Sequence, residues 1–320
     1  MKLSQPASPY RFWKPVRSKT QPNLKTINME TIAKMQQRLQ DSGYFANVET
    51  AQAIRAMLVL ERPLLIEGPP GVGKTAVAHT LAKLFDETLL RVQCYEGIEA
   101  DKLLYDYNYA KQLLMISMIK DRIHKKIAQQ SIHKAIETLD KEDVFWGEHF
   151  LIKRPLLQAI VPENGKRQIL LIDEVDKTEK DAEALLLEVL SEYTISIPEY
   201  GTVQASIKPI VVLTGNRTRE LTEALRRRCV YLYLDYPDEE TEKAIVRLHV
   251  PDADETYLQR VVDTVQKIRK LPLKHIPAVS ETMEVLQLLM ATNGDSAGWL
   301  NLLAKHHEDH HTIMQSDTVL

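Results

Sequence analysis

The 320-residue sequence predicts an α/β fold, in which a mainly parallel five-stranded sheet is flanked by helices and followed by a small C-terminal all-α domain. Short apolar runs that end in glycine or in acidic residues alternate with segments of helical spacing, which is the order of β-α-β units. These runs are apolar along most of their length, as are the strands of a sheet covered on both faces. After Pro237 only helical spacing continues, which predicts the all-α part.

The predicted elements follow one another in a regular order. Helical spacing begins near Thr31, breaks at Ser42-Gly43 and resumes after residue 47. Strands are predicted within residues 62–68, 87–94, 167–174, 208–215 and 230–236. Later helices are predicted over residues 238–250, 255–271 and 279–292. We therefore expect three parts, which are an N-terminal extension with a leading helix (1–45), a large α/β nucleotide-binding domain (46–236), and an α-helical domain with a tail (237–320).

Composition and charge narrow the class of protein. The formal net charge is −3 and no long block carries one sign, so neither a nucleic acid nor a membrane surface is required as a partner. Two cysteines cannot form a disulfide framework, which favours a reducing compartment. No run approaches the roughly 18 apolar residues of a membrane span. The basic, proline-rich start fits an unpacked extension, with a transit peptide as the alternative. We expect a cytoplasmic protein.

A glycine-rich turn between a predicted strand and a predicted helix is the strongest chemical signal. The stretch "EGPPGVGKT" fits the pattern G-x-x-x-x-G-K-[ST] of loops that bind polyphosphates. Its backbone N–H groups would point inward, Lys74 would reach the β- and γ-phosphates, and Thr75 would bind Mg²⁺. An ordinary Gly/Pro turn is the alternative, which the flanking elements disfavour. The residues expected to hold the nucleotide, ATP, are Gly68, Pro69, Pro70, Gly71, Val72, Gly73, Lys74, Thr75 and Ala76.

Acidic residues end the third predicted strand, "QILLIDE". The carboxyl ends of parallel strands border the ligand crevice of such a sheet, so Asp173 and Glu174 should face the nucleotide. Asp173 is suited to hold Mg²⁺ through its water shell, and Glu174 is suited to orient or polarise the attacking water. A solvated acidic turn is the alternative for this pair. Asp176 is expected to be a capping or surface carboxylate.

The fourth predicted strand, "IVVLTGN", ends in a polar side chain, Asn216. An amide near the γ-phosphate can hold the water and report whether that phosphate is present. When this stretch is considered by itself, a turn asparagine is an equal alternative. The order of phosphate loop, acidic strand and Asn-ended strand favours the catalytic role.

That order, followed by "ALRRRC" and an all-α domain, resembles the AAA+ P-loop NTPases, and within them the MoxR family, most closely its CoxD-like members. The resemblance covers roughly residues 46–295. The closer match is carried by "QCYEGIEADKLLYDYNYAKQLL", "GEHFLIKRPLLQAI", "LSEYTISIPEYGTVQA" and "LTGNRTRELTEALRRRC". The resemblance implies a C-terminal lid domain, Mg²⁺-dependent hydrolysis of ATP to ADP and phosphate, and self-assembly into a ring, usually a hexamer.

The resemblance also implies that nucleotide lies between neighbouring subunits and that an arginine of the next subunit completes the site. The matching arginine, directly before the last strand of the large domain, is Arg228. A guanidinium is always charged and presents a planar fork of donors to phosphate oxygens, which suits this task. Arg226 and Arg227 are expected to stabilise the last turn of the helix through the helix dipole. Arg227 is also the second candidate for an interface contact. Cys229 is expected to be a small buried residue.

Segments between the motifs are candidate contacts with a client protein. MoxR proteins typically insert hairpins that project towards the pore or a client, and residues 149–160 and 193–207 stand at the corresponding places. An ordinary helix and a simple β-hairpin are the respective alternatives. Tyr105, Tyr107 and Tyr109 alternate, and form either a contact surface or a half-buried strand edge. The family usually works with a partner that contains a von Willebrand factor A domain.

Two features near the C-terminus stand outside this pattern. MoxR relatives often have a nucleotide-contacting arginine at the start of a lid helix, where this chain has Glu281, which puts the second sensor in doubt. The stretch "KHHEDHH" places His306 with His310, and His307 with His311, at helical spacing. Such spacing can bind metal, but a solvated polar tail is favoured.

The sequence therefore predicts a MoxR-type ATPase that remodels or activates a client protein, by inserting a metal cofactor or restoring an inhibited enzyme. Its expected catalytic residues are Glu174, Asn216 and Arg228. The alternative is a nucleic-acid-directed AAA+ protein, a loader or a restriction motor, which should show a basic strip along the pore or an added DNA-binding domain. Only the first 25 residues are basic here. An ATP-binding scaffold without turnover is a third hypothesis, against which Glu174 and Arg228 argue.

Overall fold

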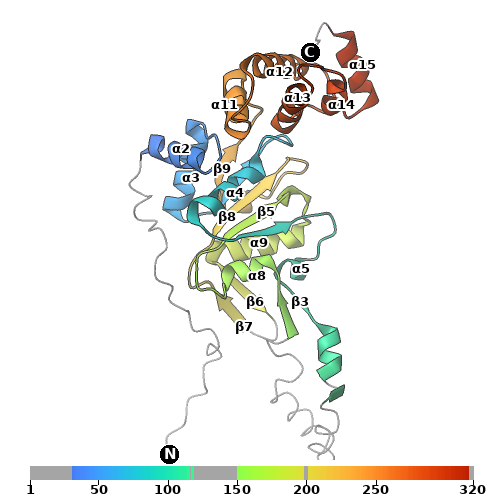
Figure 1. Cartoon of the computed structure of the whole chain (residues 1–320). Helices are drawn as coiled ribbons and strands as arrows, with labels where there is room; N and C mark the ends of the chain where they lie inside the picture. Colours follow the sequence, from blue (N-terminus) through green and yellow to red (C-terminus); the bar gives the residue numbers. More distant parts are fainter. Residues whose placement is uncertain (1–30, 116, 119–149, 198–200, 317–320) are drawn as a thin grey trace, which may run out of the picture.

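The central element of the protein is a five-stranded sheet of strand order β2-β5-β8-β1-β9. The computed structural model describes residues 31–115, 117–118, 150–197 and 201–316 (Figure 1). Within them the sheet strands are β1 (Leu64–Glu67), β2 (Leu89–Gln93), β5 (Ile169–Asp173), β8 (Ile210–Gly215) and β9 (Val230–Tyr233). All neighbouring strands run parallel, so the predicted parallel five-stranded sheet is confirmed.

Both faces of this sheet are covered, because successive apolar residues of each strand point to opposite sides. In β5, Leu170 and Ile172 belong to one apolar cluster, and Ile169 and Leu171 belong to another. Every residue of β5 and β8 is buried. The alternation explains why these strands are apolar along their whole length, as the sequence indicated.

The two clusters are completed by helices on opposite sides of the sheet (Figure 1). One face is covered by α2 (Ile32–Asp41), α3 (Val48–Leu60) and α4 (Lys74–Phe85). The other face is covered by α5 (Ala100–Leu104), α8 (Pro155–Ile160), α9 (Lys180–Glu192) and α10 (Glu223–Arg228). A short 3₁₀ helix, η2 (Val175–Lys177), follows β5 directly. The carboxyl end of the sheet, where its parallel strands end, is therefore occupied by loops.

Two small antiparallel pairs occupy the segments that the sequence marked as candidate client contacts. Strand β3 (Tyr105–Tyr107) pairs with β4 (Leu151–Lys153), and α8 follows, so residues 150–160 form a strand and an ordinary helix, while residue 149 lies outside the described residues. Strands β6 (Thr194–Ile197) and β7 (Gly201–Gln204) form a simple hairpin whose tip is not described. Both pairs lie at the end of the molecule opposite the C-terminal helices (Figure 1).

The C-terminal part is helical, as predicted for residues 238–292. It consists of α11 (Glu239–His249), α12 (Glu255–Ile268), α13 (Val279–Ala291), α14 (Trp299–Leu303) and α15 (His307–Gln315), which share an apolar cluster of their own. The boundaries expected for the domains stay a prediction. None of the helices in the described part of the chain is long and apolar enough to cross a membrane.

The histidine-rich tail forms a helix that packs on this helical part through Asp309 and Ile313, while His306, His307 and His311 are exposed, as expected of a solvated tail. Ile313 of α15 is fully buried, and the buried carboxylate of Asp309 accepts hydrogen bonds from the backbone N–H groups of Lys274 (2.8 Å) and His275 (2.9 Å). The helical register brings the rings of His307 and His311 to a centroid separation of 4.9 Å. Among the residues that the structure describes, no group of three or more His, Cys, Asp or Glu side chains could hold a metal ion.

Candidate active site

Residues 68–76 form the loop between β1 and α4 and the first turn of that helix, as the motif predicts. The loop depends on glycine at two close approaches. Gly68 has a φ of 156°, and a Cβ added there would lie 1.9 Å from the carbonyl oxygen of Leu234. Gly71 has a φ of 78°, and a Cβ there would lie 2.2 Å from the Cβ of Ala278, which precedes α13. The loop is thus packed between the end of β9 and the start of a C-terminal helix.

The side chain of Lys74 is folded back into its own loop. Its Nζ donates to the carbonyl oxygens of Gly68 (2.8 Å) and Pro69 (2.6 Å). Burial lowers the pKa of Lys74 below its ordinary value, although the nearby carboxylates of Asp176 and Asp173 oppose that shift. The ammonium group therefore lies inside the loop, where its N–H donors are available to a phosphate. Together with the N-terminus of the 12-residue helix α4, this fits a polyphosphate.

Thr75 and Asp173, which the sequence selected from separate motifs, lie side by side. The Thr75 hydroxyl donates to Oδ1 of Asp173 at 3.4 Å, and the Thr214 hydroxyl donates to the same oxygen. Oδ2 of Asp173 forms an ion pair of 2.5 Å with Arg91 of β2. A hydroxyl and a carboxylate at the start of α4 are oxygen ligands of the kind that Mg²⁺ prefers. These two residues therefore fit the cation that the motif calls for.

The side chain of Glu174 is held by Gln93, at the end of β2, and by Lys177, in the short helix η2 that follows Glu174. Its Oε2 accepts from Gln93 Nε2 at 2.9 Å and from Lys177 Nζ at 2.8 Å, and its backbone N–H donates to the Thr214 hydroxyl at 3.0 Å. Within the described part of the chain its other carboxylate oxygen, Oε1, has no hydrogen-bond partner. The residue also has a left-handed backbone, with a φ of 57°. These contacts fix the carboxylate at the end of β5, beside Asp173.

Gln93 and Arg91 were not among the site residues predicted from the sequence, although a signal for Gln93 exists. Gln93 pairs in register with Asp173 across β2 and β5, so its side chain stands at the same edge of the sheet as the acidic pair. The polar end of "LLRVQ" matches the polar ends of the other strands. Only the strand order, in which β2 neighbours β5, turns that resemblance into a contact.

Asp176 is a buried anchor, so the expectation of a surface carboxylate was wrong. The residue is 2% exposed, and its Oδ2 accepts from the backbone N–H groups of Asn216 (3.1 Å) and Thr218 (2.8 Å) and from the Thr218 hydroxyl (2.7 Å). Burial alone would raise the pKa of Asp176, but these hydrogen bonds outweigh it and lower the pKa. The loop after β8 leaves backbone donors that need an acceptor, and Asp176 supplies it.

Asn216 directly follows β8, the strand that lies between β5 and β1. It therefore stands between the acidic pair at the end of β5 and the phosphate loop at the end of β1. Its backbone is fixed by Asp176, while its side chain is half-buried. The position is the one that the sequence order indicated, and its role in catalysis stays a prediction.

Arg228 lies at the opposite end of β1 from its own phosphate loop. It is the last residue of α10, and Val230, which begins β9, donates its N–H to the carbonyl oxygen of Pro63 at 2.7 Å. The start of β9 is thus beside the start of β1, whereas the loop follows the end of β1. The Arg228 side chain is exposed and, within the described ranges, makes no hydrogen bond or ion pair.

The other two arginines of the cluster have partners in their own subunit. Arg226 forms an ion pair of 2.6 Å with the buried carboxylate of Glu67, so the helix dipole alone does not account for it. Arg227 pairs with Glu223 on the exposed side of α10. Cys229 is buried, as expected, and burial raises the pKa of its thiol to about 12. Arg228 is consequently the arginine of the three that is available to a neighbour.

Glu281, which matches the position of the sensor arginine that the MoxR resemblance implies, caps its own helix. Its Oε2 accepts from the backbone N–H of Ala278 (3.0 Å) and from the Ser280 hydroxyl (2.9 Å), and its Oε1 lies 3.3 Å from His275 Nε2. Burial alone would raise the pKa of Glu281, but these hydrogen bonds lower it. The side chain of Glu281 therefore stabilises the start of α13. Ala278, the residue before α13, in turn packs against Gly71 of the phosphate loop.

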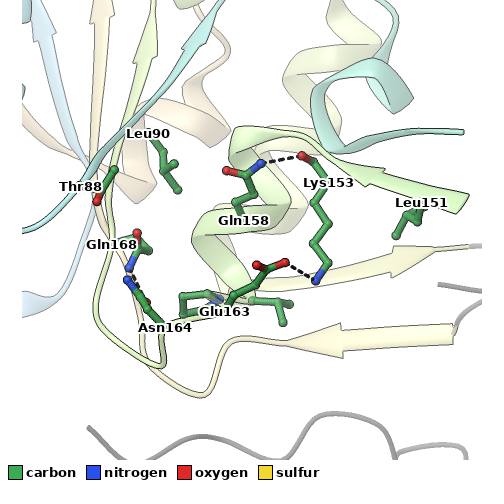
Figure 2. Close-up of a pocket in the computed structure, with 10 residues that line it drawn as sticks. Thr88, Leu90, Leu151, Lys153, Gln158, Glu163, Asn164 and Gln168 are labelled. Atoms are coloured by element: carbon green, nitrogen blue, oxygen red, sulfur yellow. Dashed lines mark hydrogen bonds and ion pairs between the residues drawn. The ribbon is translucent and has the colours of Figure 1, made fainter. Parts of the chain in front are cut away.

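A separate pocket of about 680 Å³ lies along the edge strand β2, between β2, β4 and α8. Figure 2 shows Gln158 donating to the carbonyl oxygen of Lys153 at 2.7 Å, and the Lys153 ammonium paired with Glu163 at 3.4 Å. None of the residues that line this pocket belongs to the phosphate loop or to the acidic pair. The pocket is thus distinct from the candidate active site.

Comparison with known proteins agrees with this geometry. The profile of the family described as AAA domain (dynein-related subfamily) matches residues 63–229, more than half of the chain. The gas vesicle ATPase GvpN of Haloferax mediterranei is 27% identical over 228 residues, which are 68% of this chain and 59% of that protein. The gas vesicle ATPase GvpN2 of Halobacterium salinarum is 30% identical over 212 residues, which are 63% of this chain and 55% of that protein.

The alignment covers only part of these relatives, since the chain spans less than three fifths of the length of either. An uncharacterized protein of Staphylococcus aureus is 21% identical over 223 residues, which are 68% of this chain and 72% of that protein. Among solved structures, a protein of Cytophaga hutchinsonii aligns with 90% of this chain and 85% of its own, at 16% identity and a TM-score of 0.43.

Proposed function

Because the chain belongs to the AAA domain family, dynein-related subfamily, a family of ATPases whose cofactors are ATP and Mg²⁺, we propose that it hydrolyses ATP at sites shared between subunits of a ring. ATPases of this kind typically assemble into rings. The observation that carries the proposal is the position of Arg228, which is exposed at the far end of β1 from its own phosphate loop. A guanidinium in that place favours a neighbouring site over the site of its own subunit.

The residues of one subunit have distinct tasks in this proposal. Lys74 would leave the loop carbonyls and donate to the phosphates, while Thr75 and Asp173 would hold Mg²⁺, which would neutralise phosphate charge. Glu174 is held through Oε2 alone, so its Oε1 is free to accept a hydrogen bond from the attacking water. Asn216 supports that water from the end of β8. Arg228 of the next subunit stabilises the charge that develops on the transferred phosphoryl group, an effect worth roughly 10³-fold or more in rate.

We further assign the chain to the MoxR branch and propose that it remodels or activates a client protein. Motif order and the stretches quoted above support the branch, and membership of the CoxD-like group stays a prediction. A protein client is favoured by apolar side chains on a helical segment after β3. Tyr109, Leu113, Leu114 and Met118 are between 61% and 78% exposed. This segment projects beyond β3, away from the C-terminal helices (Figure 1). Clustered exposed apolar side chains are typical of protein contact sites, whereas nucleic-acid contacts depend on cationic side chains.

The experiment that tests the shared site is steady-state ATPase activity against protein concentration. Wild-type protein is compared with Glu174→Gln, with Arg228→Ala and with an equal mixture of the two. In the mixture some sites combine a good Glu174 with a neighbour's Arg228. We expect specific activity to rise with concentration and the mixture to recover part of it, whereas each variant alone is inactive but still binds ATP. Flat specific activity without recovery in the mixture would refute the ring.

Two further measurements separate a protein client from the alternative. Binding of DNA that is strong at low salt and falls steeply as salt rises would support a nucleic-acid-directed protein instead. Stimulation of the ATPase by a purified protein with a von Willebrand factor A domain would support that partnership, which rests on resemblance to the MoxR family. Replacing Leu113 and Leu114 by serine should remove any stimulation of the ATPase by a client protein, while the basal ATPase rate is kept.

A further inference from the structure

The helix that ends in Arg228 is held at its C-terminus from the start of strand β1. The guanidinium of Arg62 donates to three consecutive backbone carbonyls, those of Arg227, of Arg228 at 3.0 Å and of Cys229 at 3.3 Å. The last carbonyls of a helix have no partner inside the helix. A cationic side chain that satisfies them therefore fixes where the helix ends.

The same helix is held from the other end of β1 by Glu67, the residue directly before the phosphate loop. Glu67 is 1% exposed, and its Oε1 accepts from Arg226 at 2.6 Å while its Oε2 accepts from the Tyr231 hydroxyl at 3.0 Å. The guanidinium of Arg217 lies 3.9 Å from the same Oε2. A carboxylate this buried needs hydrogen-bonding partners, so the pair with Arg226 is a fixed contact rather than a transient surface one.

Resting on the shared-site ring proposed above, we propose that Arg62 and Glu67 are positioning residues, which hold α10 so that Arg228 projects into the neighbouring subunit's site. Helix α10 has only six residues, and its own N-cap, Thr222, fixes just the other end. Arg228 has no partner of its own within the described residues, so its direction follows from the helix that carries it. Both positioning residues act through α10 and not on the reacting atoms of their own site.

The alternative is that Glu67 merely stabilises the phosphate loop of its own subunit. Mixed rings separate the two, because a subunit whose own site is already inactive reports only on the finger it donates. Arg228→Ala subunits keep a complete site and lack a finger, whereas Glu174→Gln subunits donate a finger and do not turn over. We would measure the ATPase rate of Arg228→Ala mixed with Glu174→Gln, and of Arg228→Ala mixed with Glu67→Gln/Glu174→Gln.

We expect the double variant to restore about tenfold less activity than Glu174→Gln restores, with an unchanged KM for ATP. A catalytic group misplaced by about 1 Å can lose up to ~10²-fold in rate, and the substrate-binding loop in the active subunit is untouched. Equal recovery with both donors would overturn the inference, since Glu67 would then act only within its own subunit. Absence of recovery with Glu174→Gln itself would instead overturn the shared site, so the two failures are distinguishable.

A matched control comes from the exposed side of the same helix. Glu223 pairs with Arg227, and both side chains are 75% exposed, so Glu223→Gln/Glu174→Gln should restore as much activity as Glu174→Gln. Thermal unfolding of each donor checks that it is folded. Should the Glu67 double variant unfold, Arg226→Gln/Glu174→Gln breaks the same pair from the helix, and Arg62→Gln/Glu174→Gln removes the other hold. Weaker recovery with either donor would support the inference, and full recovery with both would overturn it.

Discussion

Substitution of Gly71 by alanine tests whether the predicted lid, the helical part formed by α11 to α15, rests on the phosphate loop when no nucleotide is bound. Gly71 has a φ of 78°, and an added Cβ would lie 2.2 Å from the Cβ of Ala278. Ala278 is the residue before α13, so any shift that relieves the overlap moves either the loop or the start of that helix. The substitution therefore converts a close approach into a measurable loss of stability.

Two contributions to that loss can be estimated. An alanine in the left-handed region costs about 1–2 kcal/mol. Ordinary contacts of a Cβ begin at 3.4 Å, so the facing groups must separate by more than one ångström, and overpacking of this kind typically costs a further 1–3 kcal/mol. Gly73→Ala is the matched control, because its φ is 90° and an added Cβ meets nothing within 4 Å. Gly73→Ala should therefore lose only the backbone contribution.

The assay is urea unfolding without nucleotide, followed by circular dichroism. We expect Gly71→Ala to lower the free energy of unfolding by about 2–5 kcal/mol, and Gly73→Ala by about 1–2 kcal/mol. Ala278→Gly should restore about 1–3 kcal/mol in the Gly71→Ala background, because it removes the facing methyl group. By itself Ala278→Gly should have little effect, since glycine is better than alanine at an N-cap.

One result would refute this reasoning. If Gly71→Ala and Gly73→Ala lose the same free energy of unfolding, and Ala278→Gly restores none of it, then α13 does not rest on the phosphate loop. The capping of α13 by Glu281 would then have no bearing on nucleotide binding. A restored value in the double variant, by contrast, would establish a contact through which the lid can respond to the loop without a sensor arginine.

Three further predictions follow from single contacts. Lys74→Ala should weaken ATP binding by roughly 10–100-fold, as expected for loss of charge-assisted hydrogen bonds, in a titration with a fluorescent ATP analogue. Gln93→Ala should lower kcat about tenfold with little change in ATP affinity, because Glu174 loses one of its two anchors; an unchanged kcat would contradict that role. Glu183 is buried, and although burial alone would raise its pKa, hydrogen bonds from Thr222 lower it. The ionised carboxylate thus adds stability above its ordinary pKa of about 4.3, and that stability is lost as pH falls through the lowered value. Glu183→Gln should unfold at a lower urea concentration than wild type at pH 7, and the difference between the two midpoints should shrink as pH falls through the lowered pKa; a constant difference would contradict the assignment.

Much of the fold follows from local patterns in the sequence. The strand that becomes β5 and the turn that becomes the phosphate loop are set by residues within a few positions of one another, so their position along the chain could be predicted. The helices α11, α12 and α13 likewise have regular apolar spacing and capping side chains at Asp238 and Asp254. These features depend on nothing distant.

Contacts between segments far apart in the sequence were not predictable in the same way. Glu67 and Arg226 are separated by 159 positions, and Gln93 meets Glu174 only because β2 lies next to β5. Asp176 lies in a charged stretch that is typical of a surface turn, yet the backbone N–H groups after β8 require its carboxylate as a hydrogen-bond acceptor. Strand order and the unpaired backbone groups of other loops decide whether such side chains are buried. The spacing of residues along one segment does not show either of these.

The resting place of Lys74 changes how the energy of nucleotide binding is distributed. A lysine side chain that becomes fixed loses about 2 kcal/mol of rotamer entropy. Since the ammonium of Lys74 is already held by the carbonyls of Gly68 and Pro69, that loss belongs to folding and is not repeated when ATP arrives. In the proposed site, ATP binding would exchange one set of hydrogen bonds for another, and release of the product would let the ammonium return. The loop would thus be preorganised for ATP, and nucleotide exchange would switch one side chain between two ordered positions.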